Sequence, residues 1–97
     1  MCNSIEGFLK SEHFNYRQWD RQISDHLLTK ILKNIETKND NTLLIVSRQV
    51  LKKINKNIKE ELFIKVDHKT LITCFYCSFQ EYKVSMRIQN YIIISKI

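Results

Sequence analysis

The pattern of apolar residues changes near residue 60, and this change limits what the chain can fold into. Between residues 16 and 37 the apolar side chains recur every three or four positions, which predicts a helix with one broad apolar side. From residue 61 onward, apolar and polar side chains alternate instead, which predicts β-strands. Helices followed by strands in this way are typical of the α+β class, in which helices cover one face of a sheet.

The first part of the chain contains two predicted helices, at about residues 16–38 and 47–59. Asn15 precedes the first helix and Ser47 the second, and both residue types cap helix N-termini by accepting a hydrogen bond from a backbone amide. A short apolar run near residues 43–46 lies between the helices and predicts a buried strand.

The N-terminal residues are predicted to add one helical turn around residues 5–10, which places Phe8 and Leu9 on the core. Tyr16 and Trp19 have two interpretations. Exposed aromatic side chains often anchor a binding partner. Aromatics at the start of an amphipathic helix more commonly begin its buried stripe, and the spacing favours that interpretation.

The second part of the chain predicts an antiparallel β-meander on which the two helices pack. Its four strands are expected at about residues 61–66, 69–79, 82–88 and 91–96. With 97 residues the chain is expected to form a single α+β domain. The segment from Tyr91 to Ile97 is apolar except for Lys96, so at a sheet edge it is a candidate for pairing with a second copy in a homodimer.

The composition is basic and lacks the residues that usually build turns. The formal net charge is +6, and the chain has one Gly, no Pro and no Ala. The scarcity of these residues indicates a gene from an AT-rich genome, as in many phages, plasmids and low-GC bacteria. A basic chain favours an acidic partner, either nucleic acid or an acidic surface of a host protein or ribonucleoprotein.

The sequence also bears on location. It shows no apolar stretch of signal-peptide type and none of the ~20 residues that cross a bilayer, so no membrane association is expected. Its three cysteines do not resemble a disulfide framework. The expected location is therefore the cytoplasm of a host cell.

Residues 47–59 carry five positive charges and no acidic residue. On a helix most of these cations form a row opposite an apolar side, and such a row can contact successive phosphates or an acidic groove. The alternative is a purely structural role, in which the cations form a solvated helix face in a lysine-rich chain, although such a face usually includes Glu. The five residues are Arg48, Lys52, Lys53, Lys56 and Lys59.

A second candidate surface is the polar face of the meander. Lys83 and Arg87 are expected to point outward beside Tyr76 of the neighbouring strand. Aromatic side chains among cations can stack bases while the cations hold the backbone. The favoured interpretation is nevertheless structural, with Tyr76 in cross-strand packing and the cations serving solubility.

No catalytic, metal or cofactor site is predicted. Cys74 and Cys77 have the spacing of half a zinc site, but side chains three apart on a continuous strand point to opposite faces, so buried thiols are expected. A single Gly cannot build a phosphate-binding loop, and no nucleophile motif or paired carboxylates occur.

These features predict a small, non-enzymatic binding protein of a phage or mobile element. The expected mechanism is occupation of a surface on a host nucleic-acid-handling machine, in the manner of an anti-CRISPR inhibitor. Two alternatives stay open: a regulator that binds DNA or RNA directly, and a structural subunit of a virion or other assembly.

Overall fold

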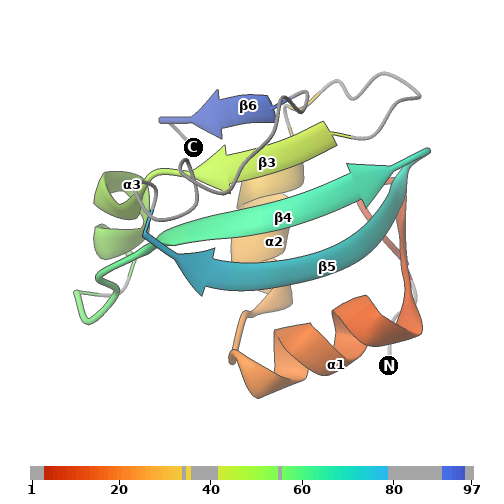
Figure 1. Cartoon of the computed structure of the whole chain (residues 1–97), viewed down its shortest axis with the longest axis horizontal. Helices are drawn as coiled ribbons and strands as arrows, with labels where there is room; N and C mark the ends of the chain where they lie inside the picture. The colour runs from red at the N-terminus through yellow and green to blue at the C-terminus, as the bar shows by residue number, and fades with distance from the viewer. Residues whose placement is uncertain (1–3, 34, 36–41, 55, 79–90, 96–97) are drawn as a thin grey trace.

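A computed structural model of the chain describes residues 4–33, 35, 42–54, 56–78 and 91–95. Within these ranges, three helices and a mixed sheet of six strands confirm the predicted α+β class. The two longer helices lie against one face of the sheet (Figure 1). Among the described residues, no helix is long and apolar enough to cross a membrane.

The elements are short, and the strands are not ordered as in the chain. The strands are β1 (Ser4–Ile5), β2 (Phe8–Lys10), β3 (Thr42–Val46), β4 (Glu61–Asp67), β5 (Thr70–Cys77) and β6 (Tyr91–Ile94). The helices are α1 (Glu12–Asp20), α2 (Asp25–Leu32) and α3 (Arg48–Lys52). In the sheet the spatial order is β1-β2-β5-β4-β3-β6.

The predicted meander is wrong in its connectivity. β3, β4 and β5 pair antiparallel, but β6 pairs in parallel with β3, and β2 pairs in parallel with β5. The short strand near 43–46 is therefore interior, and all five of its residues are buried. Alternating apolar and polar residues predict that a segment forms a strand, but not which strand it pairs with. Parallel strands also need a crossover connection, which the alternation does not reveal. The predicted strand at 82–88 lies outside the described residues.

The predicted helix at 16–38 is two helices, α1 and α2. Ser11, rather than Asn15, caps α1, because its Oγ accepts a hydrogen bond of 3.0 Å from the Phe14 amide. Ser24 caps α2 in the same way, with 3.1 Å to the Leu27 amide. Between the helices, Gln22 takes the left-handed conformation at φ 56°, which stops α1. The apolar spacing continues through this break, so periodicity alone does not reveal it.

The predicted helical turn at 5–10 is also wrong, because β1 and β2 form a hairpin. Its turn places Glu6 at φ 49° and Gly7 at φ 82°. The only Gly of the chain thus lies where a left-handed backbone is needed. Because neighbouring strand residues point to opposite sides, Phe8 is buried as expected while Leu9 is exposed.

Both faces of the central strands carry buried apolar side chains. The helix-side core joins Phe14 of α1 and the apolar side of α2 to alternate residues of β3 to β6. On the opposite face, Phe63 stacks on Phe75 with ring centroids 5.3 Å apart and an interplanar angle of 4°. A β-bulge between Lys65 and Val66 shifts the register of β4 on β5. The bulge lets Leu71 and Cys74, three positions apart, both face the helix-side core.

Candidate binding surface

The basic segment forms a much shorter helix than predicted. Ser47 caps α3 as expected, accepting a hydrogen bond of 3.2 Å from the Gln49 amide, but the helix ends at Lys52. Val50 and Leu51 are buried, whereas Ile54, the next member of the apolar stripe, is exposed. The exposed Ile54 therefore offers little burial to offset repulsion between the lysines, and the helix ends, although Ile58 again packs against the helix-side core.

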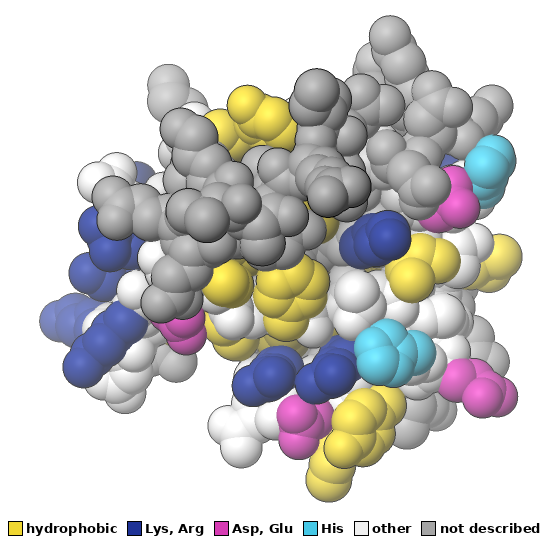
Figure 2. All heavy atoms as spheres, viewed as in Figure 1, with side chains coloured by type: hydrophobic (Ala, Val, Ile, Leu, Met, Phe, Trp, Pro, Cys, Tyr) yellow, Lys and Arg dark blue, Asp and Glu magenta, His cyan; other side chains and the backbone are white. Residues whose placement is uncertain are grey.

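The five predicted cations nevertheless share one end of the molecule, which we call the basic end: Arg48, Lys52, Lys53, Lys56 and Lys59. All five are exposed. Figure 2 shows lysine and arginine side chains gathered at the left, over α3 and the loop that follows it. In the part of the chain that the structure describes, none of the five forms an ion pair. Their charge is available to a partner.

Tyr76 does not lie on the polar sheet face where the sequence places it. It faces the helix-side core opposite Leu62 of β4, where it is half-buried, and burial raises the pKa of its hydroxyl. Its cross-strand neighbour in the described sheet is Leu62, whereas the packing predicted against the strand at 82–88 lies outside the described residues. Lys83 and Arg87 lie outside the described residues.

Tyr76 instead lines a depression next to the basic end, which we call the phosphate depression because the cationic side chains of Arg21 and Lys59 line it. Its volume is about 440 Å³. It also brings together Lys59 and Glu60 from the loop after α3 with Arg21 and Gln22 from the α1–α2 junction. The sequence does not single out Arg21, because the helix break that positions it is hidden by the continuous apolar spacing.

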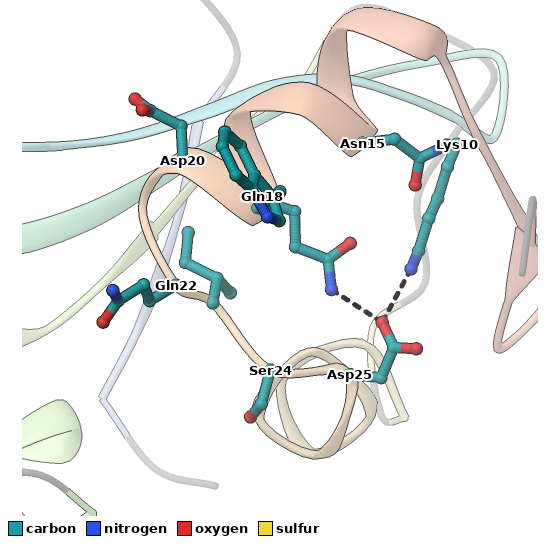
Figure 3. A pocket seen from close by; sticks show the side chains of 9 residues that line it. Lys10, Asn15, Gln18, Asp20, Gln22, Ser24 and Asp25 are labelled. Atoms are coloured by element: carbon teal, nitrogen blue, oxygen red, sulfur yellow. Dashed lines mark hydrogen bonds and ion pairs between the residues drawn. The ribbon is translucent and has the colours of Figure 1, made fainter. Parts of the chain in front are cut away.

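A second, larger depression of about 620 Å³ lies between α1, α2 and β2, and we call it the aromatic depression. Lys10 Nζ lies 2.6 Å from Asp25 Oδ1, and Gln18 Nε2 donates a 2.7 Å hydrogen bond to the same oxygen (Figure 3). The Lys10 side chain is only 2% exposed, whereas that of Asp25 is 55% exposed. The hydrogen bonds from Lys10 and then Gln18 hold the pKa of the Asp25 carboxyl below its ordinary value.

Trp19 lines the aromatic depression and is 73% exposed. Tyr16 is 55% exposed, with its ring centroid 6.3 Å from that of Trp19 and the planes tilted by 40°. The prediction that these two residues begin the buried stripe is wrong. Phe14 takes that place because α1 begins after Ser11. Ser11 followed by the acidic Glu12 is a recognisable pattern for a helix N-terminus, and it predicts that the helix begins at Glu12.

Cys74 and Cys77 lie on opposite faces of β5, as their spacing predicts. Cys74 is buried in the helix-side core, and Cys77 is partly buried on the opposite face, where it packs against the cluster that contains Phe63. Burial raises the pKa of the Cys74 thiol to about 12. Within the described ranges, no three His, Cys, Asp or Glu side chains gather as metal ligands would.

β6 stands at one end of the order of described strands. Tyr91 and Ile93 are about half exposed, while Ile94 is buried in the helix-side core. The sheet therefore presents apolar side chains at the position where the sequence predicts a homodimer edge.

Comparison with known proteins finds no matching family model, no matching curated protein and no matching solved structure.

Proposed function

We propose that this is a non-enzymatic binding protein that contacts a polyanionic partner through its basic end. The observation that carries the proposal is the exposure of all five cations of residues 47–59 with no ion pair to another described residue. Like charges held close together repel one another, and an anionic partner removes that cost. Phosphates or clustered carboxylates would supply the complementary charge.

The role we propose is occupation of a host nucleic-acid-handling machine in the cytoplasm, as an anti-CRISPR inhibitor does. The AT-rich composition and the basic charge support this role. The basic end would either cover an acidic groove of the host protein or ribonucleoprotein, or hold the nucleic acid itself. Inhibition would follow the stoichiometry of binding, because no turnover is involved.

The test compares the wild-type chain with the triple variant Lys52→Glu, Lys53→Glu, Lys56→Glu. Binding to single- and double-stranded DNA and RNA, and to purified ribonucleoprotein effectors, is measured between low and physiological salt. If all five cations contact phosphates, the logarithm of the binding constant falls with that of salt at a slope of about −4 to −5.

A matched control variant carries the same change of charge elsewhere: Lys30→Glu, Lys33→Glu and Lys69→Glu, all exposed and outside the basic end. We expect the basic-end variant to lose binding and the control to retain most of it. Equal losses in both variants would mean that only net charge matters, and the basic end would then not be the binding surface.

Of the possible partners, nucleic acid is favoured by a specific observation. The exposed Trp19 lies in the last turn of α1, two residues before Arg21, which lines the phosphate depression. Aromatic faces beside cations bind bases and backbone together.

The structural-subunit alternative depends on self-association through β6. Ile92→Lys tests it cleanly, because Ile92 is partly exposed whereas Ile94 is buried and its substitution would disturb the core. If β6 forms a homodimer, sedimentation of the wild type at high concentration shows a dimer that Ile92→Lys abolishes and that the basic-end variant retains.

A further inference from the structure

We infer that the two depressions form one path for single-stranded nucleic acid, with a phosphate in the phosphate depression and an unstacked base on Trp19 in the aromatic depression. This inference rests on the proposed function, since the basic end supplies the attraction that brings the strand to the surface. It adds the class of partner and the residues that recognise it.

The two depressions share one lining residue, Gln22. Its neighbour Arg21 belongs to the phosphate depression, and Trp19, which precedes Gln22 by three residues, belongs to the aromatic one. In Figure 3 the Gln22 side chain points away from Asp25, on the opposite side of the aromatic depression from Lys10. A strand that spans both depressions would therefore pass over Gln22.

The charges assign a different part of a nucleotide to each depression. The phosphate depression is lined by Arg21 and Lys59 against the single carboxylate of Glu60, so it has an excess of positive charge. It also lies beside the rest of the basic end, from which the backbone would continue.

The aromatic depression has the opposite balance. It is lined by Asp20 and Asp25 against the single ammonium of Lys10, so a phosphate would be repelled there. Asp20 lies 3.8 Å from the Nε of Arg21, at the boundary between the two depressions. A neutral ring with hydrogen-bond donors fits this balance, and a nucleobase is such a ring.

The aromatic depression also has the groups that bind a base. The exposed indole of Trp19 offers a face for stacking, which every base can use. The amides of Gln18 and Gln22 can donate and accept hydrogen bonds at a base edge, and the Asp25 carboxylate can accept from an exocyclic amine. The hydrogen bonds from Lys10 and Gln18 to one Asp25 oxygen fix the orientation of that carboxylate.

The partner is single-stranded because a paired base cannot reach Trp19. In a duplex the base faces are stacked, and recognition through an aromatic side chain needs bases that are splayed out. Backbone strain at the same place supports a binding role: Gln22 is held at φ 56°, where Gly is ordinarily preferred, and residues in such conformations cluster at binding sites.

The experiment uses the fluorescence of Trp19, which is the only tryptophan in the chain. The full chain is titrated at low salt with a twelve-nucleotide oligothymidine, with the matching oligouridine, and with a DNA duplex of the same length. Stacking quenches the indole, so we expect both single strands to quench the emission and the duplex to leave it nearly unchanged. The difference between the thymidine and uridine strands tells DNA from RNA preference.

Affinity is measured independently by anisotropy of labelled strands. Trp19→Ala is expected to weaken single-strand binding by about ten-fold or more. Its matched control is Tyr91→Ala, which removes an exposed aromatic from β6 and should leave affinity unchanged. Gln22→Gly relieves the backbone strain and deletes the amide, so it should weaken binding while the protein stays folded by circular dichroism.

The outcomes separate this inference from the proposed function. If single strand and duplex bind alike, without quenching and without an effect of Trp19→Ala, but the triple Glu variant loses both, the basic end is a polyanion surface and the single-strand path is wrong. If no nucleic acid binds while an acidic protein complex does, the path is likewise overturned. If the triple Glu variant binds every partner as the wild type does, the proposed function fails as well.

Discussion

The ammonium of Lys10 lies 2.6 Å from a carboxylate oxygen of Asp25, and this pair ties the N-terminal hairpin to the first turn of α2. The two partners differ greatly in their environment, since the Lys10 side chain is 2% exposed and that of Asp25 is 55% exposed. Losing one partner therefore does not cost the same as losing the other.

Substitution of Asp25 is expected to destabilise the protein more than substitution of Lys10. Asp25→Asn leaves a buried ammonium without its counter-charge, and we expect a loss of about 2–3 kcal/mol. Lys10→Met leaves only a solvated carboxylate, and we expect a loss of about 1 kcal/mol. Urea denaturation at neutral pH measures both variants. The double variant should resemble Lys10→Met, and a simple sum of the two losses would contradict a direct coupling.

The Asp25 carboxyl also predicts an acid dependence of stability. Its folded-state pKa lies below the ordinary value of 3.8, so its contribution is present above pH 3.8 and is lost as the pH falls through the folded-state pKa. We expect the difference in unfolding free energy between the wild type and Asp25→Asn to be constant from pH 5 to 7 and to shrink below pH 3.8. A difference that stays constant down to pH 2 would contradict the hydrogen bonds to this carboxyl.

The Cys74 thiol is expected to resist labelling in the folded protein. Burial raises its pKa to about 12 from 9.0, so at pH 8 the native state holds almost no thiolate at this position. In a Cys2→Ser, Cys77→Ser background, a thiol reagent should react only after denaturant is added. Because the thiol ionises at a lower pH in the unfolded chain than in the folded protein, the unfolding free energy should also fall as the pH rises above 9.0. Rapid native-state labelling would place Cys74 outside the core.

The two stacked rings of Phe63 and Phe75 are expected to contribute unequally to the stability of the fold. Phe63 is fully buried, and Phe63→Ala is expected to cost about 3–5 kcal/mol, a large part of the stability of a domain this size. Phe75→Ala should cost less, because that ring is only partly buried. Thermal and urea unfolding measure both variants. Equal costs would show that the stack, rather than the burial, dominates.

Gln22 is expected to be a site where a substitution stabilises the fold. At φ 56° a glycine has no steric penalty, so Gln22→Gly should raise the unfolding free energy by up to about 1 kcal/mol. Gln22→Ala keeps a Cβ in the same conformation and should not stabilise. A gain with Ala equal to that with Gly would mean that the side chain, rather than the backbone, carries the strain.

Alternation and capping residues predict the elements that depend on local sequence. β4 and β5 appear at the expected positions because their β-branched and aromatic residues alternate, and Ser47 caps α3 as expected. The pairing of β6 with β3 could not be predicted, because it depends on contacts between residues about fifty positions apart. The break at Gln22 is not predictable in the same way, because a single left-handed residue does not change the apolar spacing.

The candidate site shows the same division between local and long-range information. The charge of residues 47–59 is a local property that can be read from the sequence, and all five cations are exposed. The path to Trp19 depends on how the α1–α2 junction, the loop after α3 and β5 converge on Gln22 and Tyr76. Such convergence of distant segments leaves no periodic trace in the sequence.

The parallel pairing of β6 with β3 also sets an order of assembly. β4 and β5 are joined by a tight turn at residues 68 and 69, so this hairpin can form as soon as it is synthesised. β3 can join β4 soon afterwards, but its other edge has no partner until residue 94 emerges. During that interval a run of five apolar and β-branched residues presents open backbone amides and carbonyls, which is the state most prone to pair with another nascent chain. We therefore expect slower docking of residues 91–94 on β3 to increase aggregation of newly made protein.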